Sequence, residues 1–155
     1  MSISTHTIYL SVSYYQFSIR SNSSNPWDYV EKFWRTTEES ERGIATDRGI
    51  VVVRTEDPSN VTVHLLVKET GSPDINYSNW DYIVDTSISI GNSISVESFP
   101  PDADEPEFTL ALVSGDYRIR IYHSYRKEVN DRDEYFLAIW PALFSSTVTW
   151  LINPR

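Results

Sequence analysis

The stretch from Tyr82 to Ser98 has the sequence YIVDTSISIGNSISVES, and it decides the fold class. Apolar residues recur at alternate positions on both sides of Gly91-Asn92, with aspartate and serine between them. A period of two is typical of a β-strand with one buried face. A Gly-Asn pair between two such runs predicts a hairpin turn, so we expect two antiparallel strands here.

The same alternation continues along most of the chain. It recurs in residues 8–19, 61–67, 108–112, 117–123, 135–139 and 148–152, and residues 50–53 form a short, continuous apolar run. About eight strands at regular spacing, with turn signals between them, predict an all-β fold, an antiparallel β-sandwich, with a barrel as the alternative. No linker separates the strands into groups, so the 155 residues predict a single domain spanning 1–155.

Two irregular places interrupt this pattern. The alternation changes parity at Tyr14-Tyr15, which predicts a β-bulge inside the first strand. Ser114-Gly115-Asp116 predicts a turn, after which the strand from Tyr117 to His123 returns antiparallel to the strand before it.

One region favours helix over strand. Four apolar residues follow helical spacing, although a loop is the alternative for them: Trp27, Val30, Phe33 and Trp34. A second helical turn is expected over Thr37–Arg42, with Thr37 as its N-cap and Gly43 at its end. The sequence thus predicts one short helical segment within an all-β protein.

The composition limits the partners of the protein. Thirteen Lys and Arg against 22 Asp and Glu give a net charge of −9, which disfavours direct nucleic-acid binding and favours a basic partner. The absence of cysteine excludes disulfides and thiolate sites. No apolar run reaches the roughly 18–20 residues of a membrane helix. Met1–His6 lacks the features of a signal peptide, so we expect a cytoplasmic protein.

Catalytic and metal-binding signals are weak. His6, His64 and His123 are the candidate bases, and no G-x-S-x-G motif surrounds a serine. His64 is expected to be a half-exposed strand residue, and the parity of His123 places it partly in the core. Zinc needs three or four His or Cys ligands at close spacing, which the sequence lacks. We therefore expect no catalytic residue, no metal and no cofactor.

A proline-rich loop, Phe99–Glu107, carries four carboxylates, at Asp102, Asp104, Glu105 and Glu107. Their spacing does not match an EF-hand, so a solvated acidic loop is favoured over a calcium site. Such a loop complements a basic cleft, and complementary charge steers association. We therefore select Asp102, Asp104 and Glu105 as partner-binding residues.

Aromatic residues form the second part of this hypothesis. The chain has five Trp and ten Tyr, and several of them lie beside polar loops. Core packing is the alternative for each, but desolvated aromatics dominate binding energy at interfaces. Trp34 and Trp80 are the anchors that we select.

Several strand and turn segments follow one another in a distinctive order: Leu10–Phe17, Glu41–Ala45, Asp47–Val52, Ile94–Ser98, Phe108–Leu110, Ser114–Ile119 and Asp133–Pro141. In these segments the sequence resembles a known family, the competence protein J (ComJ, or Nin) family. It spans most of the chain, and no catalytic motif is part of it. The chain departs from the named member by extra length at Trp27–Glu39 and in the C-terminal tail.

The resemblance implies a non-enzymatic inhibitor that binds a DNA-degrading nuclease, or an immunity-type partner of a toxin. Two other function classes stay open. A carbohydrate-binding-like module would present Trp27, Trp34 or Trp80 flat on one face. An enzyme would hold a histidine next to a carboxylate in a deep pocket.

Overall fold

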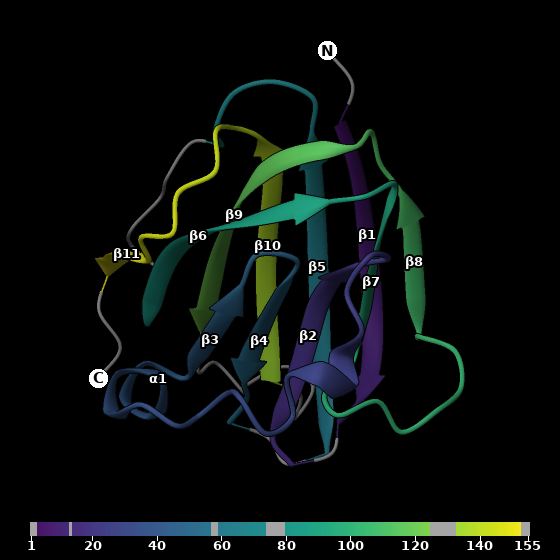
Figure 1. The fold of residues 1–155 in the computed structure, drawn as a ribbon. Helices are drawn as coiled ribbons and strands as arrows, with labels where there is room; N and C mark the ends of the chain where they lie inside the picture. Colours follow the sequence, from purple (N-terminus) through teal and green to yellow (C-terminus); the bar gives the residue numbers. More distant parts are fainter. Residues whose placement is uncertain (1–2, 13, 57–58, 74–79, 125–132, 153–155) are drawn as a thin grey trace.

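The computed structural model describes residues 3–12, 14–56, 59–73, 80–124 and 133–152. These residues form eleven strands in two sheets, which confirms the all-β prediction and raises the strand number above eight (Figure 1). The six-stranded sheet has the order β1 (Ile3–Ser11), β5 (Asn60–Lys68), β10 (Asp133–Pro141), β9 (Gly115–Ser124), β6 (Tyr82–Ile90), β11 (Thr149–Ile152). The five-stranded sheet has the order β3 (Ile44–Asp47), β4 (Ile50–Arg54), β2 (Gln16–Ser21), β7 (Ser93–Ser98), β8 (Phe108–Ala111).

The expectation of purely antiparallel sheets is wrong for one pair of strands. β5 and β10 are parallel, with Val63 opposite Tyr135, and this makes the six-stranded sheet mixed. The other pairings of both sheets are antiparallel. Alternating hydropathy specifies the buried face of a strand but not the direction of its neighbour, so the sequence could not reveal this pair.

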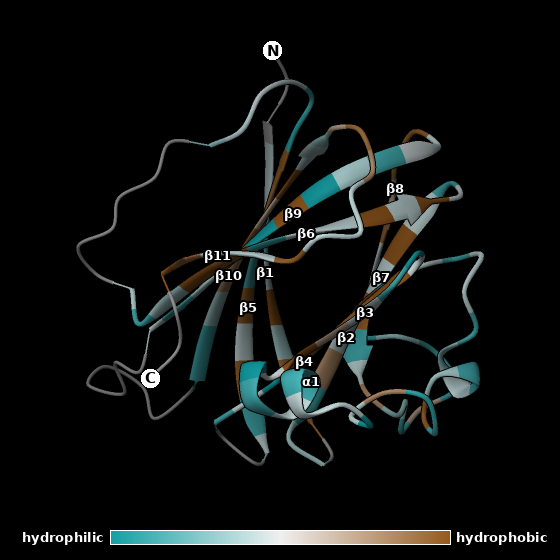
Figure 2. Cartoon of the chain, turned by 60° about the vertical axis from the view of Figure 1, so that its left-hand side comes forward, coloured by the Kyte–Doolittle hydropathy of each residue, from teal (hydrophilic) through white to brown (hydrophobic). Residues whose placement is uncertain are grey.

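The inner faces of the two sheets share one hydrophobic core. Its members come from alternate positions of both sheets, including Val63, Leu65, Ile119, Ile121, Phe17, Ile19, Val51 and Val96. Figure 2 shows the alternation of apolar and polar residues along the strands. Burying each aliphatic side chain of this kind stabilises the fold by roughly 1.5–3 kcal/mol.

The predicted bulge at Tyr14-Tyr15 is a connection between the two sheets. β1 ends at Ser11 in the six-stranded sheet, and β2 begins at Gln16 in the five-stranded sheet. Tyr14 and Tyr15 turn the chain with φ angles of 56° and 59°. The parity changes because β1 and β2 pack against the same core from opposite sides.

Two predicted hairpins are wrong for the same reason. Gly91-Asn92 joins β6 to β7, and these strands lie in different sheets. β8 and β9, on either side of Ser114, are also divided between the sheets. The amide of Asn92 donates to the side chain of Asn22 at 2.9 Å, so a contact distant in sequence fixes the first connection.

The helical predictions are confirmed in part. The helix α1 (Thr37–Arg42) is present, but its N-cap is Thr36, whose hydroxyl accepts from the Glu39 amide in a capping box. Gly43 ends the helix with φ 73°. The expected helix over 27–34 is wrong, because only the 3₁₀ turn η1 (Pro26–Asp28) is helical there. No helix in the described part of the chain is long and apolar enough to cross a membrane.

Each sheet also buries apolar residues on its outer face. On the five-stranded sheet, Phe33 packs with Phe99, Ile50 and Val52, and Trp34 lies against this cluster. On the six-stranded sheet, a separate cluster contains Ile83, Tyr122, Ala138 and Trp140, and Trp80 lies against it. The two tryptophans selected from the sequence therefore cover opposite faces of the protein.

Candidate functional site

Negative charge is concentrated on the side of the five-stranded sheet. Residues 14–56 and 91–112, which form that sheet and its loops, contain twelve acidic and six basic residues, a net charge of −6. The described segments of the six-stranded sheet contain six acidic and three basic residues, a net charge of −3. A basic partner is therefore attracted more strongly to the first side.

The acidic loop between β7 and β8 contributes most to this charge. Asp102, Asp104 and Glu105 are all exposed. Partial burial raises the pKa of Glu107 at the end of the loop, and the charges of Asp102 and Glu97 raise it further. The loop thus gathers carboxylates closely enough for them to repel one another, and a cationic partner would relieve that repulsion.

Gln16 connects the start of this loop to two other features. Its backbone oxygen accepts the amide N–H of Phe99 at 3.1 Å. Its side-chain oxygen accepts the indole N–H of Trp34, and its side-chain nitrogen donates to the Tyr14 carbonyl at 3.1 Å. The guanidinium of Arg54 covers the Trp34 ring, 4.7 Å from the ring centre. The loop, Trp34 and the Tyr14 turn therefore form one connected end of the molecule.

The tyrosines of this surface were not predicted from the sequence. Tyr14 and Tyr15 are 76% and 48% exposed, whereas Trp34 is only half-exposed. The pair belongs to an alternating apolar run, and in the sequence it looks like part of a buried strand. The change of parity was the available signal, because it marks the point where the chain leaves one sheet for the other.

Trp80 belongs to a pocket on the outer face of the six-stranded sheet. The pocket has a volume of about 450 Å³ and is lined mainly by apolar atoms. His64 stacks on Phe136 at 4.4 Å, and Trp80 meets Phe136 edge-on at 4.9 Å and Tyr122 at 5.1 Å. The structure therefore separates Trp80 from Trp34 and the acidic loop.

One histidine beside a carboxylate lines this pocket. His64 Nε2 lies 3.2 Å from Glu134 Oε2, and its Nδ1 lies 3.4 Å from the Thr7 hydroxyl. A hydrolase triad has the same three kinds of group, but there Nε2 faces the hydroxyl and Nδ1 faces the carboxylate, the reverse of His64. A hydrolase also needs N–H donors for an oxyanion, but β5 and β10 use their amides in the sheet. The contacts fit a polar edge of a binding pocket.

A second histidine–carboxylate pair lies inside the core. His123 is 1% exposed, and its Nε2 lies 2.6 Å from Asp133 Oδ1. Asp133 Oδ2 accepts from the Tyr135 hydroxyl at 2.7 Å and from the Glu56 amide at 2.8 Å. Burial acts to raise the pKa of Asp133, but its contacts with His123, Tyr135 and Glu56 outweigh burial and lower it. The contacts of Asp133 thus connect β9, β10 and the segment that follows β4.

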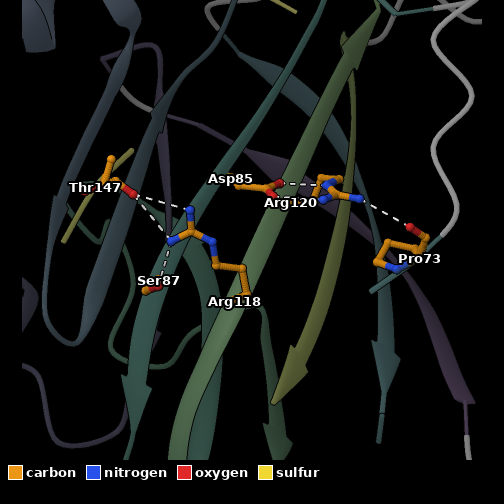
Figure 3. A network of polar contacts seen from close by, with 6 residues as sticks. All are labelled: Pro73, Asp85, Ser87, Arg118, Arg120 and Thr147. Atoms are coloured by element: carbon orange, nitrogen blue, oxygen red, sulfur yellow. Dashed lines mark hydrogen bonds and ion pairs between the residues drawn. The ribbon is translucent and has the colours of Figure 1, made fainter. Parts of the chain in front are cut away.

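A buried ion pair organises the outer face of the six-stranded sheet (Figure 3). Arg120 donates two hydrogen bonds to Asp85, at 2.7 and 2.8 Å, and a third to the Pro73 carbonyl. Arg118 on the same strand donates to Ser87 and to the Thr147 carbonyl. From β9, Arg120 thus holds the segment at Pro73, and Arg118 holds the segment at Thr147.

The described residues bring together no three His, Asp or Glu side chains that could hold a metal ion. Two further acidic residues, Glu128 and Asp131, lie outside the described residues. The described residues of this surface supply charge and aromatic side chains.

Two solved structures match the whole architecture. One is ComJ of Bacillus subtilis, described as an inhibitor of the DNA degrading activity of NucA. The TM-score is 0.71 at 18% sequence identity, over 92% of this chain and 100% of ComJ. The chain has the fold of ComJ.

The resemblance to ComJ seen in the sequence is therefore confirmed at the level of the fold. The second structure is described as crocagin biosynthetic gene J, with a TM-score of 0.63, 14% identity, and coverage of 92% of this chain and 100% of that one. No family model and no curated protein matches the sequence. The ComJ fold thus occurs in proteins with different descriptions, and the function has to be argued from the surface.

Proposed function

We propose that the chain is a non-enzymatic inhibitor or immunity-type protein that binds and blocks a basic DNA nuclease or toxin in the cytoplasm. The exposed acidic loop on a ComJ fold is the observation that carries this proposal. Its support is the fold shared with a nuclease inhibitor over 92% of the chain. The contact residues would be Asp102, Asp104, Glu105 and Trp34.

The mechanism needs only complementary charge and shape. A nuclease binds DNA phosphates in a basic groove, and the carboxylates of the acidic loop would occupy the same groove. The field of a chain with net charge −9 would accelerate encounter with that groove. DNA would then be excluded without any chemical step by the inhibitor.

Inhibition of DNA cleavage tests the proposal directly. The purified chain is titrated into plasmid digestion by NucA of Bacillus subtilis and by a panel of basic bacterial nucleases. We expect stoichiometric inhibition of at least one nuclease, with a complex visible by size-exclusion chromatography. Cleavage by every enzyme at an unchanged rate, with no complex formed, would disprove the inhibitor role.

A charge-neutralised variant tests the acidic loop. D102N/D104N/E105Q removes three exposed carboxylates, and E31Q/E41Q/E69Q makes the same change in net charge at exposed positions elsewhere. We expect the loop variant to associate at least about tenfold more slowly at low salt, and the control far less so. Because salt screens exposed charges, the difference should shrink at high ionic strength.

The aromatic pocket favours a second candidate function, binding of a small apolar ligand. Its volume of about 450 Å³ lies in the range of ligand sites, and Trp80 provides a fluorescent reporter. Titration with an aromatic-compound library, read by quenching of tryptophan fluorescence that W80F abolishes, tests this function. A glycan array, read by binding of the labelled chain and of W80F, tests the carbohydrate-binding alternative. Ester hydrolysis, measured with H64A as control, tests the enzymatic alternative.

A further inference from the structure

Two neighbouring tyrosines project from the turn between β1 and β2. Tyr14 is 76% exposed and Tyr15 is 48% exposed. Their φ angles of 56° and 59° lie in the left-handed region, which is unfavourable for bulky side chains and easy for glycine. The chain thus holds two large rings in water, on a backbone that disfavours them, and strain of this kind clusters at binding sites.

The turn is held in place from within. The carbonyl of Tyr14 accepts from the Gln16 side chain at 3.1 Å. The carbonyl of Tyr15 accepts from the Thr55 amide at 2.7 Å. Two bonds, one from the first residue of β2 and one from the residue after β4, therefore fix the backbone that carries the rings. An anchor that is fixed before binding loses less conformational entropy in the complex.

The surroundings of the rings indicate what they would contact. Gln16 also accepts the Phe99 amide, which places the start of the acidic loop beside the turn. Figure 1 shows the turn and the loop between β7 and β8 at the same end of the molecule, the lower one in that view. Aromatic anchors beside a charged rim are typical of protein interfaces.

From these observations we infer that Tyr14 and Tyr15 are the anchor residues of the inhibitory surface. Their rings enter the basic groove of a DNA-degrading enzyme, where they pack on the stems of arginine and lysine side chains. The carboxylates of the acidic loop pair with the charged ends of those side chains. This inference rests on the proposed function and adds to it the residues that provide affinity.

The substitution Y14N/Y15N tests the inference without straining the fold. Asparagine tolerates the left-handed region better than other large residues, so the turn keeps its conformation while both rings are lost. Tyr9 provides the matched control, because it is 65% exposed but lies on the outer face of the six-stranded sheet. Y9T removes a ring whose exposure lies between those of Tyr14 and Tyr15, at a strand position that suits threonine.

The readout is the inhibition constant for the nuclease that the unchanged chain blocks. We expect Y14N/Y15N to raise it roughly thirtyfold or more, as for interface anchors, and Y9T to leave it within about threefold. Circular dichroism and thermal unfolding confirm that both variants fold.

Other outcomes overturn the inference in distinguishable ways. If Y14N/Y15N inhibited as strongly as the unchanged chain, Tyr14 and Tyr15 would not be anchors, and the proposed inhibitor role would still stand. A dimer that Y14N/Y15N converts to monomer, with inhibition intact, would show that the rings bind a second copy. Failure of the unchanged chain to inhibit any nuclease would reject the proposed function together with the inference.

Discussion

The indole N–H of Trp34 donates to the side-chain oxygen of Gln16 at 2.5 Å. This bond ties the irregular segment before α1 to the first residue of β2. The same glutamine donates to the Tyr14 carbonyl. One side chain therefore contacts both Trp34, which lies on the outer face of the five-stranded sheet, and the turn at Tyr14-Tyr15. Displacing Gln16 should therefore disturb both features at once.

The Gln16–Trp34 bond should give a measurable coupling energy. Q16A and W34F each remove one partner, and each should lower the free energy of unfolding by about 1 kcal/mol. The double variant should lose about 1 kcal/mol less than the sum of the single variants. Urea unfolding of all four proteins measures this coupling, and strictly additive losses would show that the bond does not contribute.

The position of the helix cap gives a second prediction. Thr36 caps α1 through its hydroxyl, while the adjacent Thr37 lies inside the helix and is exposed. T36A should lower the free energy of unfolding by about 1 kcal/mol, because the Glu39 amide loses its acceptor. T37A is the matched control and should change stability little. A larger loss for T37A would place the cap where the sequence alone predicted it.

The strands could be predicted because their pattern is local. The alternation in β5 and β6 reflects the face that packs into the shared core and needs no knowledge of partners, although β6 is buried on its outer face as well. The partners themselves could not be predicted, because strands of both sheets bury the same core and carry the same pattern. Gly91-Asn92 therefore resembles a hairpin in the sequence but connects two sheets in the structure.

The candidate surface could be predicted only in part. Asp102, Asp104 and Glu105 lie in a proline-rich loop, and prolines and charges mark exposed loops in any sequence. The separation of Trp34 from Trp80 depends on which outer face each residue covers, and that follows from sheet order. The tyrosine turn depends in part on a long-range bond from the Thr55 amide to the Tyr15 carbonyl, and its only local signal is the change of parity.

The buried ion pair of Arg120 and Asp85 gives a third prediction. The hydrogen bonds to Asp85 raise the pKa of Arg120. Arginine is protonated at neutral pH even without a partner, so the side chain stays charged when Asp85 is lost. D85A should cost about 3–5 kcal/mol, because it leaves an uncompensated charge under the protein surface.

Two variants provide controls for D85A in thermal or urea unfolding. D85L/R120M should cost much less, because it removes both charges. E38A breaks an exposed pair with Arg42 and should cost less than about 0.5 kcal/mol. A cost for D85A as small as that for E38A would contradict the buried-charge explanation.

The lowered pKa of Asp133 predicts sensitivity to acid. The folded protein binds this proton less tightly than the unfolded chain, whose carboxyl has the ordinary value near 3.8. Its contribution to stability is therefore complete above that value and is lost as the pH falls through the lower folded value. In urea unfolding between pH 2 and 7, D133N should be less stable by about 3 kcal/mol at neutral pH.

D133N should also flatten the decline of stability below about pH 4, since the titrating group is gone. Asp104→Asn, at an exposed position of the acidic loop, is the control and should leave that decline in place. If the free energy of unfolding declined equally steeply below about pH 4 for the unchanged chain and for D133N, groups other than Asp133 would control acid unfolding.

The two tryptophans selected from the sequence should behave differently in the inhibition assay. Each is half-buried against an outer hydrophobic cluster, so W34A and W80A should both lower stability through lost packing. Only Trp34 lies at the end that carries the acidic loop and the tyrosine turn, through its bond to Gln16. W34A should raise the inhibition constant about tenfold, and W80A should leave it nearly unchanged when both are assayed well below their melting temperatures. The reverse result would move the inhibitory surface to the pocket on the six-stranded sheet, because the two faces point away from each other and one groove cannot contact both.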